Sequence, residues 1–180
     1  MNKYLLILLS SIICIETVHA ADGTITFKGK VLDSTCKVNN GGGANLTVSL
    51  PNVSLSSLNN AGQVAGRTAF KIILSGCSAT QVTAFFEPGA TVNSNTGRLI
   101  NSVTTGTSAK NIDIQLLNSK GQQIMLNAFG SDGTQTNTEW QSASSASTST
   151  ELSYAAEYYA TAAVTAGEVN TSVQYTLIYK

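Results

Sequence analysis

This sequence of 180 residues has very few histidines and cysteines, the side chains that enzymes most often use as bases, thiol nucleophiles and zinc ligands. The only histidine is His19, and the cysteines are Cys14, Cys36 and Cys77. Residues 1–20 have the pattern of a cleaved signal peptide, so His19 and Cys14 are expected to leave with it. The remaining chain would then have no histidine, which excludes a Ser-His-Asp triad, a Cys-His pair and a zinc site built from histidine and cysteine.

Carboxylates are the other groups that could support catalysis, because two of them can share the acid and base roles in glycoside hydrolysis. Glu151 with Glu157, or Asp113 with Asp132, could form such a pair, but nothing in their spacing favours it. No phosphate-binding loop of the form G-x-x-x-x-G-K-[ST] occurs. The single tryptophan, Trp140, could stack on a sugar, although packing is its more common role. We therefore expect no enzyme, no cofactor, no metal site and no small-molecule substrate.

The N-terminal segment predicts the compartment in which the protein works. Lys3 precedes an almost unbroken apolar run over residues 4–15, and residues 18–20 form a small-residue cleavage site before Ala21. The apolar run is shorter than the roughly 20 residues of a membrane-spanning helix. The mature chain is therefore expected to be exported.

Charge and cysteine content are both low. Lysine plus arginine and aspartate plus glutamate number 10 each, so the net charge is zero and nothing points to nucleic acid or to an anionic membrane. In an oxidising compartment the two mature cysteines, Cys36 and Cys77, predict one disulfide rather than two free thiols. Such a bridge would stabilise the fold by about 4 kcal/mol in the chain-entropy model.

Apolar residues alternate with polar ones in many short segments that are separated by glycine, proline and asparagine turns. This period of two predicts β-strands, and no segment gives a convincing helix. The pattern therefore predicts an all-β sandwich. The expected strands cover residues 46–50 with a possible continuation to 58, residues 68–77, 81–87, a short piece at 99–100, a hairpin of 112–116 with 123–126, residues 151–164 and residues 169–180.

The first mature segment, residues 23–33, also alternates. Ile25, Phe27, Gly29 and Val31 fall on one face, so the segment is expected to be a strand whose apolar side needs a partner. A strand so near the mature N-terminus could pair within its own domain or reach into another subunit. At the other end of the chain, residues 169–180 are expected to form a long strand with no strand after it, and an unpaired edge of this kind invites association.

Several of these segments together resemble the type 1-like pilins of the chaperone–usher pathway. The resemblance covers the whole mature length, and its most specific part is the C-terminal motif, with the penultimate Tyr179 and Gly167 fourteenth from the end. A modest departure is Ala163, where relatives often have glycine. The other segments that carry the resemblance are residues 24–36, 48–51, 69–77, 159–162 and 173–180.

The resemblance implies an incomplete immunoglobulin-like β-sandwich that lacks its last strand and is completed in trans by a donor strand. The implied organisation is a signal peptide at 1–20, a donor-strand extension at 21–33 and a pilin domain at 34–180. The implied donor residues are Ile25, Phe27, Gly29 and Val31. The implied acceptor groove and terminal strand contain Gly167, Val173, Tyr175, Leu177 and Tyr179, and the implied disulfide joins Cys36 to Cys77.

The function implied by the resemblance is that of a structural subunit of a fimbria, which polymerises by donor-strand exchange to form the rod and supports adhesion. Its partners would be other copies of itself, other pilus subunits, a periplasmic chaperone and an outer-membrane usher. It would pass through the periplasm and reside in the extracellular fimbria. Two alternatives remain open, a minor adaptor subunit near the tip and a self-contained secreted sandwich that binds a ligand.

Overall fold

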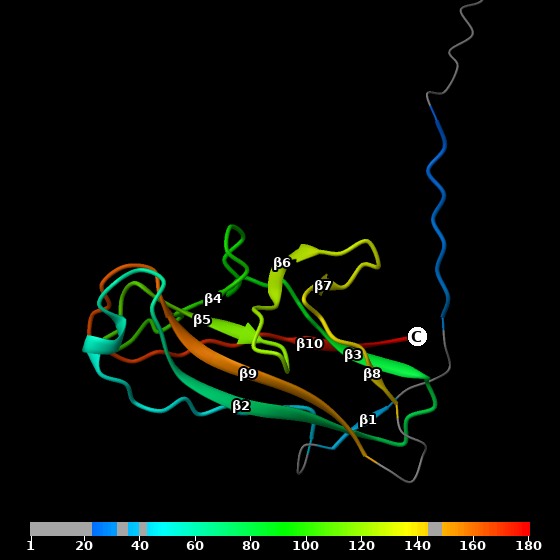
Figure 1. The fold of residues 1–180 in the computed structure, drawn as a ribbon, viewed down its shortest axis with the longest axis horizontal. Coiled ribbons are helices and arrows are strands. Elements are labelled where there is room, and N and C mark those ends of the chain that lie inside the picture. Colours follow the sequence, from blue (N-terminus) through cyan, green and yellow to red (C-terminus); the bar gives the residue numbers. More distant parts are fainter. Residues whose placement is uncertain (1–22, 32–35, 40–42, 144–148) are drawn as a thin grey trace, which may run out of the picture. The chain divides into compact units, whose positions relative to one another are not determined.

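The computed structural model describes residues 23–31, 36–39, 43–143 and 149–180. These residues belong to two compact units, which divide after Val31 and are described separately (Figure 1). The first unit contributes residues 23–31, which are assigned to no strand, and the side chains of Ile25, Phe27 and Val31 are 81%, 91% and 100% exposed. The predicted signal peptide at 1–20 lies outside the described residues.

The second unit contains a five-stranded antiparallel sheet with the order β1, β2, β9, β5, β4 (Figure 1). In the long central pair, Phe70 of β2 lies opposite Tyr154 of β9, and Ile72 lies opposite Leu152. Alternation directs Ile72 and Leu74 to the inner face, where both are buried. The strand bounds are Lys37–Val38 for β1, Val64–Ser75 for β2, Thr150–Ala160 for β9, Ile112–Leu117 for β5 and Leu99–Ile100 for β4.

A second, three-stranded sheet has the order β10, β3, β8. These strands span Tyr175–Tyr179, Gln81–Phe86 and Gln141–Ser142, respectively. The pair β6 (Met125–Phe129) and β7 (Gln135–Thr136) and the short 3-10 helix η1 (Leu55–Leu58) complete the described elements. In the described part of the chain, no helix has the length and apolar character that crossing a membrane requires.

The two sheets pack on each other through a shared core. The ring of Tyr154 on β9 lies 5.6 Å from that of Phe70 on β2 and 5.3 Å from that of Phe86 on β3, measured between centroids. Because β3 and β9 belong to different sheets, this cluster joins the two layers. The all-β sandwich is therefore confirmed. A disulfide between Cys36 and Cys77 links the segment before β1 to the residues that follow β2, as predicted.

Three of the expected strand segments are corrected by the structure. Residues 46–50 and 169–174 belong to no strand, because no neighbouring strand supplies a hydrogen-bonded ladder to either within the described chain. The possible continuation over residues 53–58 is replaced by η1. Ser54 explains this change, since its hydroxyl accepts a hydrogen bond from the N–H of Ser56 at 3.3 Å and caps the short helix.

The chain after β5 also differs from the expected hairpin. The return of residues 123–126 onto β5 is reduced to one bridge, between Leu117 and Gln123, and β6 pairs instead with β7. β7 lies in residues 130–138 and β8 in residues 141–150, and neither range is among the strands expected from the sequence. Residues 144–148 of that stretch are outside the described residues.

Candidate strand-acceptor groove

A groove of about 1310 Å³ is bordered by two extended segments, residues 44–50 and residues 169–177. Its floor is the inner face of the five-stranded sheet, so the groove opens directly onto the hydrophobic core. Among the described residues that line it, the only charged one is Glu87. The floor side chains come from β2, β5 and β9: Phe70, Ile72, Ile114, Leu116, Ala156 and Tyr158.

One border of the groove is β10, which is the last strand of its sheet. Toward β3, the N–H of Glu87 donates to the carbonyl of Gln174 at 2.8 Å, and the N–H of Lys180 donates to the carbonyl of Gln81 at 3.0 Å. Main-chain groups of a strand alternate in direction, so the even-numbered positions 174–180 bond to β3 and the odd-numbered ones face away from it. In the described chain no strand pairs with β10 on that second side. The open side therefore presents the main-chain groups of Tyr175, Leu177 and Tyr179.

Two tyrosine hydroxyls connect β10 to the N-terminal part of the domain, one of them to the opposite border at Ala44 and the other to Cys36. The hydroxyl of Tyr175 donates to the carbonyl of Ala44 at 2.7 Å, and the N–H of Cys36 donates to the hydroxyl of Tyr179 at 3.1 Å. Burial raises the pKa of Tyr175 above its ordinary value, which already leaves the hydroxyl protonated and able to donate at neutral pH. The Tyr175 contact joins the two borders, while no strand of the described chain pairs with the main-chain edge between them.

At one end, the groove adjoins a second cavity of about 590 Å³ that shares Leu50 and Tyr158 with it and is also lined by Gly167. A Cβ atom on Gly167 would lie 2.4 Å from the nitrogen of Ala109 and 2.6 Å from the carbonyl oxygen of Thr107. Contacts this short are impossible against main-chain atoms, so only glycine fits. Gly167 thus allows the segment that leads to β10 to lie directly on residues 107–109.

The side chain of Asn101 fixes the same segment. Its Nδ2 donates to the carbonyl of Ala109 at 3.0 Å and to that of Glu168 at 2.9 Å, while its Oδ1 accepts from the N–H of Asn170 at 3.0 Å. One carboxamide therefore joins the loop before β5 to the segment that forms a border of the groove. This role gave no signal in the sequence, because a single asparagine in a polar loop has no periodicity.

The carboxylates considered as catalytic pairs are engaged elsewhere. Burial raises the pKa of Asp113, and a weaker opposing influence comes from Arg98. In the described chain, no group of three or more histidine, cysteine, aspartate or glutamate side chains could hold a metal ion. Each of the four carboxylates forms an ion pair with a different basic residue: Glu157 with Arg67 at 2.7 Å, Glu151 with Lys71 at 2.6 Å, Asp113 with Arg98 at 3.4 Å and Asp132 with Lys180 at 3.5 Å.

The arrangement is suited to binding an extended polypeptide. An added strand would find unpaired main-chain groups along β10 and an apolar floor for every second side chain. Of the acceptor residues predicted from the sequence, Val173, Tyr175 and Leu177 line the groove, Gly167 lines the adjoining cavity, and Tyr179 lies on β10 with its hydroxyl bonded to Cys36. The second border, residues 44–50, was missed as part of the site although the alternation of its apolar residues was visible.

Comparisons with known proteins agree on one family. Residues 50–180 match the model of the family described as FimA, type-1 fimbrial protein, A. The major fimbrial subunit SMF-1 of Stenotrophomonas maltophilia is 50% identical over 161 residues, which cover 89% of this chain and 94% of the relative. The F17 fimbrial protein of Escherichia coli is 41% identical over 167 residues, with 89% of each chain covered.

The fold also matches solved structures. A chain from the structure of a chaperone–usher pilus superposes with a TM-score of 0.61 at 21% identity, covering 92% of this chain and 99% of that one. This likeness confirms the predicted fold class, an immunoglobulin-like sandwich that lacks a strand. Together, the family match and the identities of 50% and 41% lead to one conclusion: the chain belongs to the type-1 fimbrial protein family.

Proposed function

We propose that this protein is the structural rod subunit of a chaperone–usher fimbria, and that it polymerises by donor-strand exchange and supports adhesion. The observation that carries the proposal is the edge of β10, with which no strand of the described residues pairs, beside an apolar groove. Unsatisfied main-chain groups and exposed core side chains are both unfavourable, and one added strand would remove both defects. The similarity to a major fimbrial subunit at 50% identity supports the rod role over that of a minor adaptor.

The proposed donor is the extension at residues 21–33 of another copy. Its apolar face carries Ile25, Phe27, Gly29 and Val31, and the three larger side chains are almost fully exposed. Transfer of each large apolar side chain from water into the groove would contribute about 1.5–3 kcal/mol. Lys28 and Lys30 fall on the opposite face, so they would stay in solvent when the apolar face is buried.

The proposed contact is heterologous, because each subunit gives an extension and receives a different one in its groove. Contacts of this kind produce an open filament unless the rotation closes a ring. The proposed partners are other copies of the chain, other pilus subunits, a periplasmic chaperone that covers the groove before assembly, and an outer-membrane usher. The proposed route is export through the periplasm to the cell-surface fimbria, and the protein acts without catalysis.

Deletion of residues 21–32 tests the role of the extension. The truncated subunit is expected to bind a synthetic peptide of residues 21–33 and to fail to polymerise, whereas the complete mature chain forms filaments. A peptide of the same composition in scrambled order serves as the control. If the truncated protein were an equally stable monomer that still assembled normally, the donor-strand proposal would be wrong and a self-contained sandwich would be favoured.

Electron microscopy of cells that lack the gene separates the rod role from the adaptor role. Loss of the whole filament is expected for the rod subunit. Retention of filaments with loss of a tip activity alone would instead identify a minor adaptor.

A further inference from the structure

The three-stranded sheet has a second edge, along β3, on the side away from β10. Even-numbered residues of β3 direct their main-chain groups to this side, since the odd-numbered ones bond to β10. β8 covers only the beginning of the edge. It pairs with Gln81 and Val82, and the N–H of Ala143 donates to the carbonyl of Thr80 at 3.0 Å. The positions beyond β8 are Ala84 and Phe86.

Side chains, rather than a strand, bind the N–H groups of these two positions. The N–H of Ala84 donates to the hydroxyl of Tyr154 at 3.4 Å. The N–H of Phe86 donates to Oε1 of Gln135 at 3.0 Å, and Nε2 of Gln135 donates back to the carbonyl of Phe86. A carboxamide has the same donor and acceptor as a peptide group, so Gln135 occupies the place of one residue of a neighbouring strand. Gln135 is 1% exposed and Tyr154 is 6% exposed, so solvent has little access to either contact.

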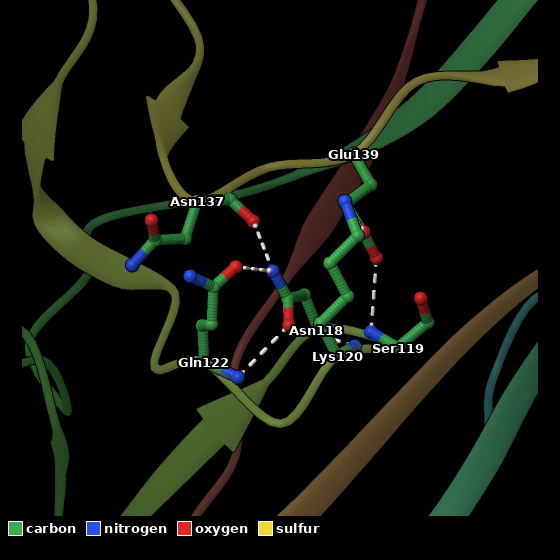
Figure 2. Close-up of polar contacts among 6 residues, drawn as sticks. All are labelled: Asn118, Ser119, Lys120, Gln122, Asn137 and Glu139. Atoms are coloured by element: carbon green, nitrogen blue, oxygen red, sulfur yellow. Dashed lines mark hydrogen bonds and ion pairs between the residues drawn. The ribbon is translucent and has the colours of Figure 1, made fainter.

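Gln135 is held in place by a polar cluster around Asn118, which is shown in Figure 2. Nδ2 of Asn118 donates to the carbonyl of Asn137 at 3.1 Å, and the N–H of Ser119 donates to Glu139 at 3.0 Å. The N–H of Thr138 donates to the carbonyl of Gln135 itself at 3.0 Å. The turn that begins at Asn118 therefore anchors the segment that follows Gln135. The carboxamide of Gln135 is thus held in place by the subunit itself, before any donor strand binds.

We propose that Gln135 and Tyr154 close the β3 edge against strand addition, so that the sheet accepts a donor strand along β10 alone. This inference rests on the proposed donor-strand function and deepens it. A subunit with two accepting edges could bind two extensions, and the polymer could branch or associate sideways. With one edge closed by its own side chains, the three-stranded sheet accepts one extension and gives no second site for branching.

The test uses filaments of the complete mature chain and a labelled synthetic peptide of residues 21–33. In wild-type filaments the grooves are already filled, so the peptide is expected to bind only at filament ends. Gln135→Met keeps the size of the side chain but removes both hydrogen bonds to Phe86. Its filaments are expected to bind about one peptide per subunit, a rise of tenfold or more, and to associate sideways. Gln115→Met is the matched control, since Gln115 is also buried but bonds to Glu157 rather than to a strand edge.

Hydrogen exchange gives a second measurement that needs no variant. In wild-type filaments, the amides of Ala84 and Phe86 are expected to exchange as slowly as those in the β2–β9 ladder, and rapid exchange would overturn the proposal. If Gln135→Met does not assemble, Tyr154→Phe provides a milder variant, for which faster amide exchange and added peptide binding are expected at Ala84.

Variant filaments that bind no more peptide than wild-type filaments would overturn the proposal that the β3 edge is closed by side chains. Binding of about one peptide per subunit by wild-type filaments would instead contradict the proposed function, because it would mean that the grooves are empty.

Discussion

Each edge of the three-stranded sheet has main-chain groups that need hydrogen-bond partners, and the two edges differ in what supplies those partners. Along β3, the N–H groups on the side away from β10 meet β8, the hydroxyl of Tyr154 or the carboxamide of Gln135. Along β10, the side opposite β3 has no strand partner in the described chain, and the apolar floor beside it is open. Unpaired edges favour association, and proteins ordinarily protect them. The contrast therefore indicates that the open edge along β10 is a specific feature of this fold rather than a general looseness of the sheet.

The two edges also differ in where their stabilisation comes from, since one is stabilised within the domain and the other is proposed to be stabilised by another subunit. The partners that cover the β3 edge belong to the same domain, so its stability should not depend on other copies. The proposed partner of the β10 edge is supplied by another subunit, so its stability should depend on assembly. Substitutions should therefore affect different properties according to where they lie. Those in the donor extension should affect filament formation, those in the segment that supports β10 should affect stability, and those near the β3 edge should affect amide exchange.

The largest effect is expected from Phe27→Asp in the extension. Phe27 is 91% exposed in this chain, and its proposed position after assembly is against the apolar floor of a neighbouring groove. The substitution removes about 1.5–3 kcal/mol of apolar burial and adds the cost of placing a carboxylate in a largely uncharged groove. Filament formation, measured by sedimentation and electron microscopy, is expected to be lost.

Lys28→Asp is the matched control for this change, because Lys28 is adjacent but falls on the opposite face of the extension. Its filaments are expected to form normally. Equal loss of assembly in both variants would show that charge alone matters, and normal assembly of Phe27→Asp would remove Phe27 from the contact.

A smaller effect is expected from Gly167→Ala, which acts on the support of the open edge. The added Cβ would meet the main chain of residues 107–109 at 2.4–2.6 Å, so the segment leading to β10 must shift. Overpacking of this kind costs about 1–3 kcal/mol. Urea unfolding of the peptide-filled subunit should show this loss, while the exchange of the Ala84 and Phe86 amides at the closed edge stays slow.

Gly43→Ala is the control for Gly167→Ala, since a Cβ at Gly43 would meet no atom within 4 Å. It should leave the urea midpoint nearly unchanged. If Gly167→Ala behaved in the same way as the control, the close approach to residues 107–109 would not be needed for the groove.

The same contrast explains which parts of the fold could be predicted from the sequence. β2, β3, β5 and β9 were predicted because each has both an alternating pattern and a partner strand in the same domain. Residues 46–50 and 169–174 alternate equally well, yet they form no strand because no strand within the described residues pairs with them. Periodicity reports which face of a segment is apolar, but it does not report whether a partner is present.

The closed edge could not have been predicted in this way. Gln135 lies in a stretch of polar residues that is typical of a loop, and its pairing with Phe86 depends on a contact between residues 49 positions apart. Asn101 and Asn118 are similar cases, in which one carboxamide joins distant main-chain groups. Tyr175 and Leu177, in contrast, line the groove, and the terminal motif of the family directs attention to their segment from the sequence alone.

The smallest effect is expected from Asp132→Asn, near the closed edge. Oδ1 of Asp132 accepts from the hydroxyl of Thr134 at 2.7 Å and from its N–H at 3.1 Å, which shapes the turn just before Gln135. These hydrogen bonds lower the pKa of Asp132 to about 2. A lowered pKa means that the folded state favours the ionised form, so the stabilisation is present above the unfolded pKa of about 3.9 and is lost as the pH falls toward 2.

Urea midpoints measured between pH 5 and pH 2 test this expectation. Wild type should lose a small part of its stability over that range that Asp132→Asn does not lose, so the two curves should converge at the acid end. Glu168→Gln, which removes one exposed negative charge at a site without such a turn, controls for the change in net charge. Because the turn leads directly into Gln135, amide exchange at Phe86 should also become slightly faster in Asp132→Asn at neutral pH. Unchanged exchange at Phe86 would mean that the Asn118 cluster alone positions the side chain that closes the β3 edge.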